Sequence, residues 1–118
     1  MDNYEEQSDF EINKAVAEAK GYDNICMGYN PDSLCVHYSG LESTMREVDY
    51  CNNPSDMWPI ILEHRISLDA IEDEHDKERY WSAIAPNGSQ FSAITWGSKN
   101  PLRAACIVYL KMKAAENE

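Results

Sequence analysis

The C-terminal segment constrains the fold of this 118-residue chain more than any other stretch. It reads SKNPLRAACIVYLKMKAAENE and covers residues 98–118. Asn100 can accept hydrogen bonds as an N-cap, and Pro101 suits the first helical position, where no backbone N–H is needed. Apolar residues then follow the helical period, and Val108 and Leu110 widen the apolar stripe. So apolar a helix must be covered by the rest of the chain, and we expect it to be extensively buried against a sheet.

A β-hairpin is the clearest local signal before that helix. Two short runs of β-forming residues in YWSAIAPNGSQFSAITW (80–96) flank Asn87-Gly88. This dipeptide supplies the positive φ values of a two-residue type I′ turn. The register that such a turn predicts pairs Ile84 with Phe91 and Trp81 with Ile94.

Two further helices are expected earlier in the chain. The segment EINKAVAEAKG (11–21) has apolar residues at helical spacing and ends at a glycine, a favourable C′ residue. A second helix follows Asn53, a good N-cap, with Pro54 at its first position. Because Pro59 would remove a hydrogen bond, we expect this helix either to start near Met57 or to bend at the proline. Its apolar face is expected to carry Trp58, Ile61, Leu62 and Arg65.

Strands are expected at residues 34–38 and 66–73, and residues 43–50 read as a strand or an extended connection. This order of elements predicts an α+β domain. We expect a small antiparallel sheet with a β-hairpin, packed by about three helices on one face. Residues 1–118 are expected to form a single domain, with 1–10 as a flexible acidic arm.

The net charge of −11 restricts the possible partners. Binding to nucleic acid or to an anionic membrane would require Lys and Arg at the contact, so neither is expected directly. A basic protein is the expected partner, including one whose own ligand is nucleic acid. Solubility alone would also explain the acidity. The sequence has no secretory signal and no apolar run long enough to span a membrane, which predicts a cytoplasmic protein.

The acidic residues gather in two places. The first group is the N-terminal arm, which carries Glu5 and Glu6. The second group begins in the expected strand at 66–73 and continues into the loop after it. It consists of Asp69, Glu72, Asp73, Glu74, Asp76 and Glu78. This loop lacks the glycine of an EF-hand calcium loop. A solvated loop and a surface that attracts a basic partner are the two interpretations. As a binding hypothesis, these eight carboxylates form the partner-binding surface.

The four cysteines are Cys26, Cys35, Cys51 and Cys106, and they form no Cys-x-x-Cys pair. In a reducing compartment we expect buried thiols rather than disulfides. The first three and His37 offer the right atoms for tetrahedral zinc, although the spacing matches no compact zinc motif. Our main expectation is a protein with no metal and no cofactor. A metal or small-ligand site on this Cys/His set is the alternative.

No catalytic motif is recognisable in the sequence. It contains no nucleophile elbow, phosphate-binding loop, dinucleotide fingerprint or paired-histidine zinc motif. His64, near the end of the second helix, is better explained by the helix dipole than by catalysis. The aromatic residues lack the interleaved basic residues of a base-stacking surface, so we expect them in the core. We therefore expect no enzymatic activity, and an enzyme with an unrecognised site is a third hypothesis.

Four segments in order resemble the NinX-like family of small phage accessory proteins: INKAVAEAKG, YCNNPSDMWPIILEHRIS, Trp81-x-Ala83 and NPLRAACIVYLKMKAAE. The resemblance covers residues 12–116, mostly through helix caps and core positions. Trp58 stands where the family pattern has glycine, and residues 22–47 lie outside the pattern. The family provides no catalytic residues. The resemblance implies a phage or prophage protein that acts in the cytoplasm of the infected bacterium.

Charge and resemblance together predict a function in binding. We expect a small acidic phage accessory protein that binds a basic host protein or nucleoprotein complex. The expected effect is to inhibit or modulate host defence machinery that binds nucleic acid, of the anti-CRISPR or anti-restriction type. The alternative is the metal- or small-ligand-binding module. The sequence leaves the partner's identity and the oligomeric state open.

Overall fold

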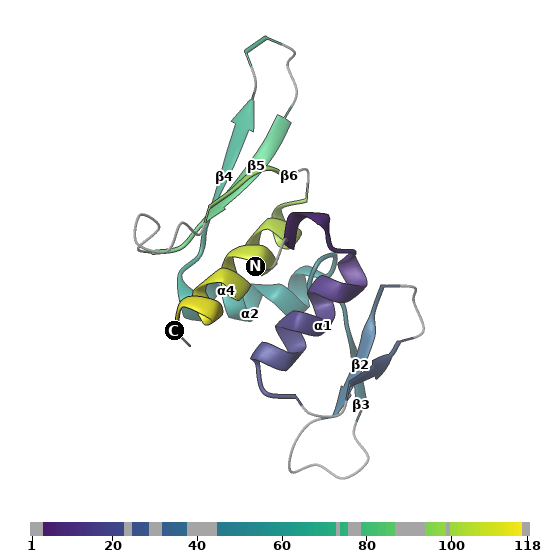
Figure 1. Ribbon diagram of the computed structural model, residues 1–118. Helices are drawn as coiled ribbons and strands as arrows, with labels where there is room; N and C mark the ends of the chain where they lie inside the picture. Colours follow the sequence, from purple (N-terminus) through teal and green to yellow (C-terminus); the bar gives the residue numbers. More distant parts are fainter. Residues whose placement is uncertain are drawn as a thin grey trace.

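The structure is a computed structural model that describes residues 4–22, 25–28, 32–37, 45–72, 74–75, 79–86, 94–98 and 100–116. Its elements, shown in Figure 1, are η1 (Tyr4–Glu6), α1 (Asp9–Ala19), β1 (Ile25–Met27), β2 (Leu34–His37), β3 (Met45–Val48), α2 (Pro54–His64), β4 (Ser67–Glu72), β5 (Arg79–Ile84), β6 (Ile94–Ser98) and α4 (Pro101–Glu116).

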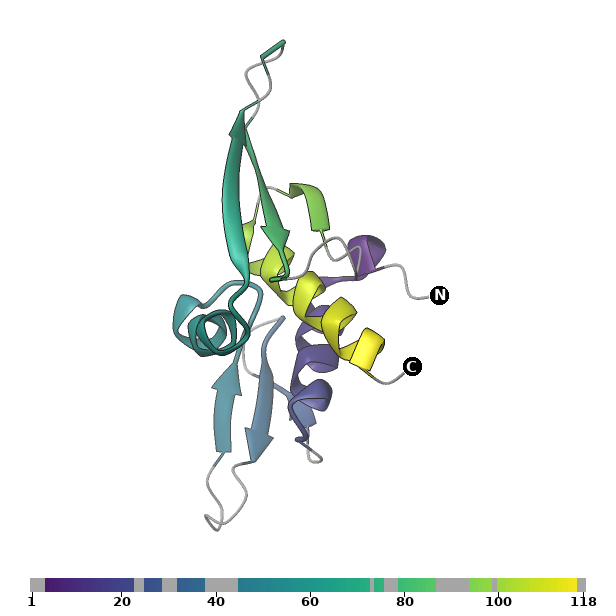
Figure 2. The same ribbon diagram turned by 90° about the vertical axis from the view of Figure 1, so that its left-hand side faces the viewer.

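The strands form two antiparallel sheets, in the orders β1-β2-β3 and β4-β5-β6. Figures 1 and 2 show α1, α2 and α4 between them. The expected α+β class is confirmed. The strands divide into two sheets rather than one because α2 separates β3 from β4, so that each half of the chain pairs its own neighbouring strands.

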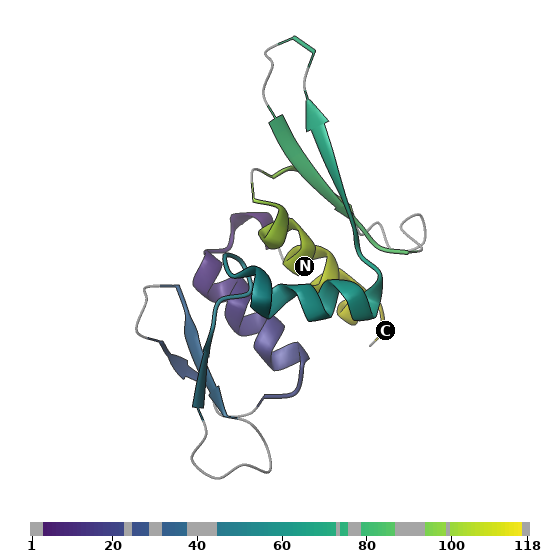
Figure 3. The same cartoon turned by 180° about the vertical axis from the view of Figure 1, so that it is seen from behind.

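Helix α4 forms the centre of the core. Seven consecutive residues, Ala104–Leu110, are buried, so this part of the helix is covered around its whole circumference. Helices α1 and α2 and the strands β5 and β6 pack against it, and Figure 3 shows α2 crossing α4 between the two sheets. Asn100 caps the helix, because its Oδ1 accepts hydrogen bonds from the backbone N–H groups of Leu102 and Arg103. The predicted burial and cap are therefore confirmed.

Helix α1 begins two residues earlier than expected because of a capping box that the sequence analysis did not use. The Ser8 Oγ accepts from the Glu11 N–H at 3.1 Å, and the Glu11 carboxylate accepts from the Ser8 N–H at 3.2 Å. At the other end Gly21 has a φ of 98°, and the N–H groups of residues 21 and 22 bond back to the carbonyls of Glu18 and Ala17. The glycine is needed at this Schellman cap because of its left-handed backbone.

Residues 4–10, the described part of the segment expected as an acidic arm, pack against the helices. Arg103 of α4 reaches them: its Nη1 lies 2.6 Å from Oδ1 of Asp9, and its Nη2 donates to the Gln7 and Tyr4 carbonyl oxygens. The side chain of Tyr4 packs against the core. The acidic composition of this segment gave no sign that a partly buried arginine of α4 pairs with it.

Helix α2 runs without interruption from Pro54 to His64, with Asn53 as its N-cap and Pro59 inside it. The buried residues are Asp56, Met57, Ile60 and Ile61. Trp58 and Leu62 point outward and are 51% and 59% exposed, so of the expected face only Ile61 was placed correctly. Polar contacts of Asp56 fix the rotation of the helix: one carboxylate oxygen pairs with Arg46 and the other accepts the Asp49 N–H.

The β5–β6 pairing confirms a hairpin, but the predicted register was wrong. Ile84 pairs with Ile94 and Ala83 with Thr95, and an irregularity precedes the pairing of Trp81 with Ser98. The connection between the strands therefore spans residues 85–93, rather than the two-residue turn that we expected. In that turn Pro86 would flank the loop in a hydrogen-bonded pair, and proline has no N–H to donate. Asn87, Gly88 and Phe91 lie outside the described residues.

Candidate interaction surface

The most prominent feature of the surface is the β4–β5 arm, which we define as residues 67–72 and 79–84. Six residue pairs join the two strands, from Ser67 with Ile84 to Glu72 with Arg79. The Ser67–Ile84 end adjoins the helices, and Figures 1 and 2 show the other end projecting away from them. Ala83, near the inner end, is completely buried, whereas Glu72 and Arg79 at the outer end are exposed. The arm therefore carries its charged residues outward.

The structure places three of the expected acidic residues on this arm and its outer end. Asp69, Glu72 and Glu74 are all exposed, and none forms a hydrogen bond or ion pair with another described residue. The positions of Asp73, Asp76 and Glu78 lie outside the described residues. Within the part of the chain that the structure describes, these three carboxylates therefore make no polar contact of their own.

The second acidic group does not join the first. Glu6 is exposed in η1, beside the first turns of α4, and the Glu5 side chain lies outside the described part. Figures 1 and 2 both show η1 well below the outer end of the β4–β5 arm. Glu6 therefore does not form one continuous surface with the described carboxylates Asp69, Glu72 and Glu74, and the arm and η1 are separate acidic regions.

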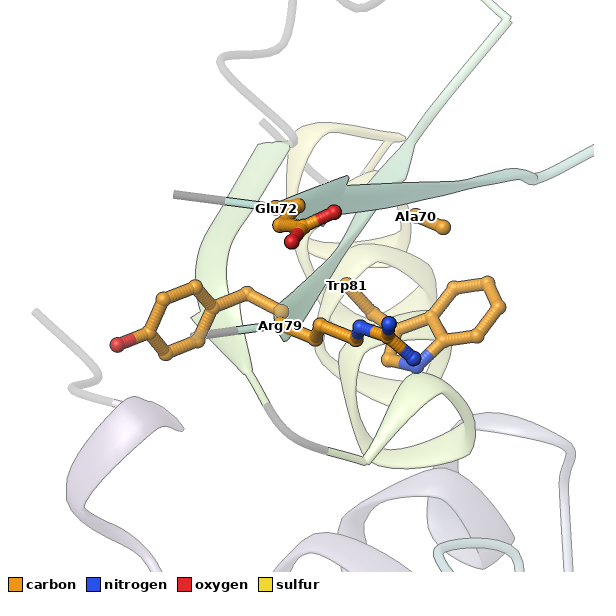
Figure 4. Close-up of a pocket in the computed structure, with 5 residues that line it drawn as sticks. Ala70, Glu72, Arg79 and Trp81 are labelled. Carbon is orange, nitrogen blue, oxygen red and sulfur yellow. The ribbon is translucent and has the colours of Figure 1, made fainter. Parts of the chain in front are cut away.

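A cavity of about 370 Å³ lies on the side of the arm. Its lining residues are Ala70, Glu72, Arg79, Tyr80 and Trp81. Four of them share one face, because the cross-strand partners are Ala70 with Trp81 and Glu72 with Arg79. Figure 4 shows Arg79 and Trp81 extending from β5, with Glu72 across from them on β4. The cavity, which we call the socket, thus places a half-buried indole beside two charges of opposite sign.

The charged pair in this socket is open to a ligand. Although Glu72 and Arg79 are cross-strand partners, their side chains form no ion pair with each other or with any other described residue. An exposed pair of this kind contributes little to stability. Both charges therefore remain available to a partner that brings its own cation or anion.

Polar side chains in the interior hold the framework rather than a ligand. Asn13 is fully buried; its Nδ2 donates to the Asp32 carbonyl at 2.7 Å and to the Asp49 carboxylate at 2.8 Å, and its Oδ1 accepts the Cys51 N–H at 2.9 Å. From the other side, Asn100 Nδ2 donates to the Cys51 carbonyl at 2.7 Å. Every group in this network has a partner, which favours a structural role.

The proposed zinc ligands divide into different places. Cys26 and Cys35 face each other across β1 and β2, whereas Cys51 is buried in the core, where its thiol donates to the Asp9 carbonyl at 3.9 Å. Cys106 is buried too, with its Sγ 3.6 Å from the Met57 sulfur, and burial raises the pKa of its thiol.

Among the described side chains, no three of His, Cys, Asp or Glu are placed to hold a metal ion together. The His37 side chain is not among them.

His64 lies in the last turn of α2, where the sequence analysis placed it. Its ring packs on Tyr109 of α4, with centroids 5.0 Å apart and planes tilted by 58°. Burial raises the pKa of Tyr109, and the nearby Glu63 and Glu116 carboxylates raise it further. The histidine therefore joins two helices at the edge of the core.

Comparison with known proteins gives one result. The family model described as bacteriophage P22, NinX, matches residues 3–113. Searches of curated proteins and of solved structures found no significant match. Within the described residues, no helix is both long and apolar enough to cross a membrane.

Proposed function

The chain belongs to the bacteriophage P22 NinX family, and from this premise we propose that it is a phage accessory protein that acts by binding a basic host protein. The observation that supports the proposal is the β4–β5 arm, whose outer end presents carboxylates that no other described residue pairs with. A charged element that projects from the body can enter a concave basic surface. The function proposed requires neither catalysis nor a cofactor.

The net charge favours such a partner. With 21 acidic and 10 basic residues, the chain attracts basic surfaces and repels nucleic acid. Proteins that bind nucleic acid carry basic grooves that contact the phosphate backbone. An acidic arm can occupy such a groove in place of the phosphate backbone. We propose host defence machinery of the restriction or CRISPR type as the target, in the bacterial cytoplasm. Binding there would inhibit or modulate the machinery.

The socket would lengthen the lifetime of the complex, which attraction between charges alone does not do. Steering by charge raises the rate of association, whereas the lifetime of a complex depends on a few well-packed anchors, among which tryptophan and arginine are enriched. Trp81 and Arg79 line the socket on the same arm that carries the acidic end. In the proposed complex, the carboxylates attract the partner and the socket receives one of its side chains.

A charge-reversal experiment tests the proposal. The variant Glu72→Lys, Asp73→Lys, Glu74→Lys, Asp76→Lys and a control variant, Glu18→Lys, Asp32→Lys, Glu63→Lys, Glu116→Lys, change the net charge equally. All four control residues are exposed and lie off the arm. Tagged proteins are used to capture partners from host lysate at low and high salt.

The wild type and the control variant should retain the same basic protein at low salt and lose it at high salt. The arm variant should lose it at both. Addition of the nucleic acid that the captured protein normally binds should displace the wild type. Equal retention by both variants would reject the arm as the binding element, and failure of nucleic acid to compete would reject the proposed groove.

A further inference from the structure

Cys26 and Cys35 face each other on neighbouring antiparallel strands. They are Cα partners in the β1–β2 register, so their side chains lie on the same face of the sheet. The Gly28 N–H donates to the Ser33 carbonyl at 3.0 Å, which makes those residues a hydrogen-bonded pair in the same register. Such pairs alternate along the strands, so Cys26 and Cys35 form the next one, with Cα atoms about 5.5 Å apart. That separation lies within the range of disulfide bonds.

The two thiols are also close and accessible. The Cys26 Sγ lies 3.8 Å from the Cys35 carbonyl oxygen, so it is directed towards the neighbouring strand. Cys26 is exposed and Cys35 is partly exposed. Partial burial raises the pKa of the Cys35 thiol, and the neighbouring Cys26 and Glu47 raise it further. Cys26 is therefore the residue that a dissolved reagent meets first, and Cys35 is the second thiol beside it.

We propose that Cys26 and Cys35 form a dithiol modification site that low-molecular-weight disulfides, such as oxidised glutathione, convert into an intramolecular disulfide. The Cys26 thiolate attacks one sulfur of the reagent; the reagent's S–S bond breaks, and one thiolate leaves and takes up a proton. The Cys35 thiolate then attacks the Cys26 sulfur and releases the second reagent thiol. Two protein thiols are oxidised, and one small disulfide is reduced to two thiols.

The bond should form reversibly. Cβ atoms of directly opposed residues in a sheet lie about 4.5–5.5 Å apart, whereas a relaxed disulfide needs about 3.8 Å. Closing the bond must draw β1 towards β2, and strained disulfides are readily reduced. A pool of reduced small thiols would therefore restore the dithiol.

The same chain contains a control pair. Cys51 and Cys106 are also neighbours, since Cys51 contributes to the raised pKa of the Cys106 thiol, but both residues are completely buried. Oxidation requires contact with the reagent as well as a nearby second thiol. The proposal therefore predicts that Cys26 and Cys35 react in the native protein and that Cys51 and Cys106 do not.

The test uses the native full-length protein and oxidised glutathione, followed by mass spectrometry of the intact chain and of its peptides. The wild type should lose two of its four free thiols without gaining glutathione, and the new bond should link Cys26 to Cys35. Cys35→Ser should keep one glutathione on Cys26, because the second step is removed. Dithiothreitol should return the wild type to four thiols.

Three results would overturn the proposal. One is a stable glutathione adduct on wild-type Cys26, which would show that Cys35 does not reach it. Another is a bond between Cys51 and Cys106 in place of the expected one. The third is four unreactive thiols in the native chain while the chain unfolded in urea reacts.

Discussion

The Arg46 guanidinium lies 2.5 Å from the Asp56 carboxylate, whose side chain is only 1% exposed, and this ion pair joins β3 to the first turn of α2. The other oxygen of the same carboxylate accepts the Asp49 N–H at 2.9 Å. A buried acid with both oxygens occupied fixes the position of the chain around it. Asp56 therefore decides which side of α2 faces the core.

Asp56→Asn should lower the free energy of unfolding by about 2–3 kcal/mol, because the amide keeps the shape but loses the charge that pairs with Arg46. Urea denaturation followed by circular dichroism measures the change. Asp69→Asn, at an exposed site on β4, should shift stability by no more than about 0.5 kcal/mol. Similar losses in the two variants would contradict the role given to Asp56.

The rotation of α2 can be tested with two neighbouring residues. Met57 is fully buried and Trp58 is half exposed. Met57→Ala should cost about 2–5 kcal/mol, the usual range for a large core side chain, whereas Trp58→Ala should cost about 1 kcal/mol or less. Thermal unfolding of both variants gives the comparison. A larger loss of stability in Trp58→Ala than in Met57→Ala would support the helix face that the sequence pattern favoured.

Arg103→Met should release residues 4–10 from α4. The variant loses the ion pair with Asp9 and the bonds to two carbonyl oxygens, while the methionine retains the apolar part of the side chain. We expect faster amide hydrogen exchange in residues 4–10 and a loss of about 1–3 kcal/mol in stability. Lys113→Met, which removes an ion pair with Glu116 and a cation–π contact with Tyr109, both distant from residues 4–10 in the sequence, should leave exchange in this segment unchanged. Slow exchange in the Arg103 variant would mean that core packing of Tyr4 holds the segment alone.

Stability should fall at alkaline pH. Burial raises the pKa of Tyr50 far above its ordinary value of 10, with further contributions from Tyr22 and Asp56. The folded chain therefore retains a proton that the unfolded chain releases above about pH 10, so the free energy of unfolding decreases as the pH rises further. Urea titrations between about pH 9 and 11 measure the slope. Tyr50→Phe should make the slope shallower, and an unchanged slope would assign the effect to other groups.

The helices could be predicted because their signals are local. Asn53-Pro54 and Asn100-Pro101 each cap and start a helix through atoms a few residues away, and both helices are found there. The face of α2 could not be predicted in the same way, because it depends on Arg46, ten residues earlier. Periodicity alone placed Trp58 on the apolar face and left out Met57, whereas Met57 is buried and Trp58 is half exposed.

The strand register could not be predicted from local sequence signals, because it depends on residues far apart in the chain. The Asn87-Gly88 signal favoured a tight turn, but the ladder ends at Ile84 and Ile94. The cysteine pairs likewise follow from register and packing: Cys26 meets Cys35 because β1 and β2 pair. The acidic residues were visible in the sequence, whereas the location of Asp69, Glu72 and Glu74 on a projecting arm required the structure.

The central position of α4 has a consequence for synthesis on the ribosome. The buried residues Ala104–Leu110 are translated after α1 and α2, so those two helices have no complete surface to pack on until α4 has emerged. The packing of α1 and α2 therefore cannot be completed before α4 has been made, and a chain that stops before this helix exposes its apolar faces. Premature termination products should accordingly be substrates for cellular proteases instead of partly active fragments.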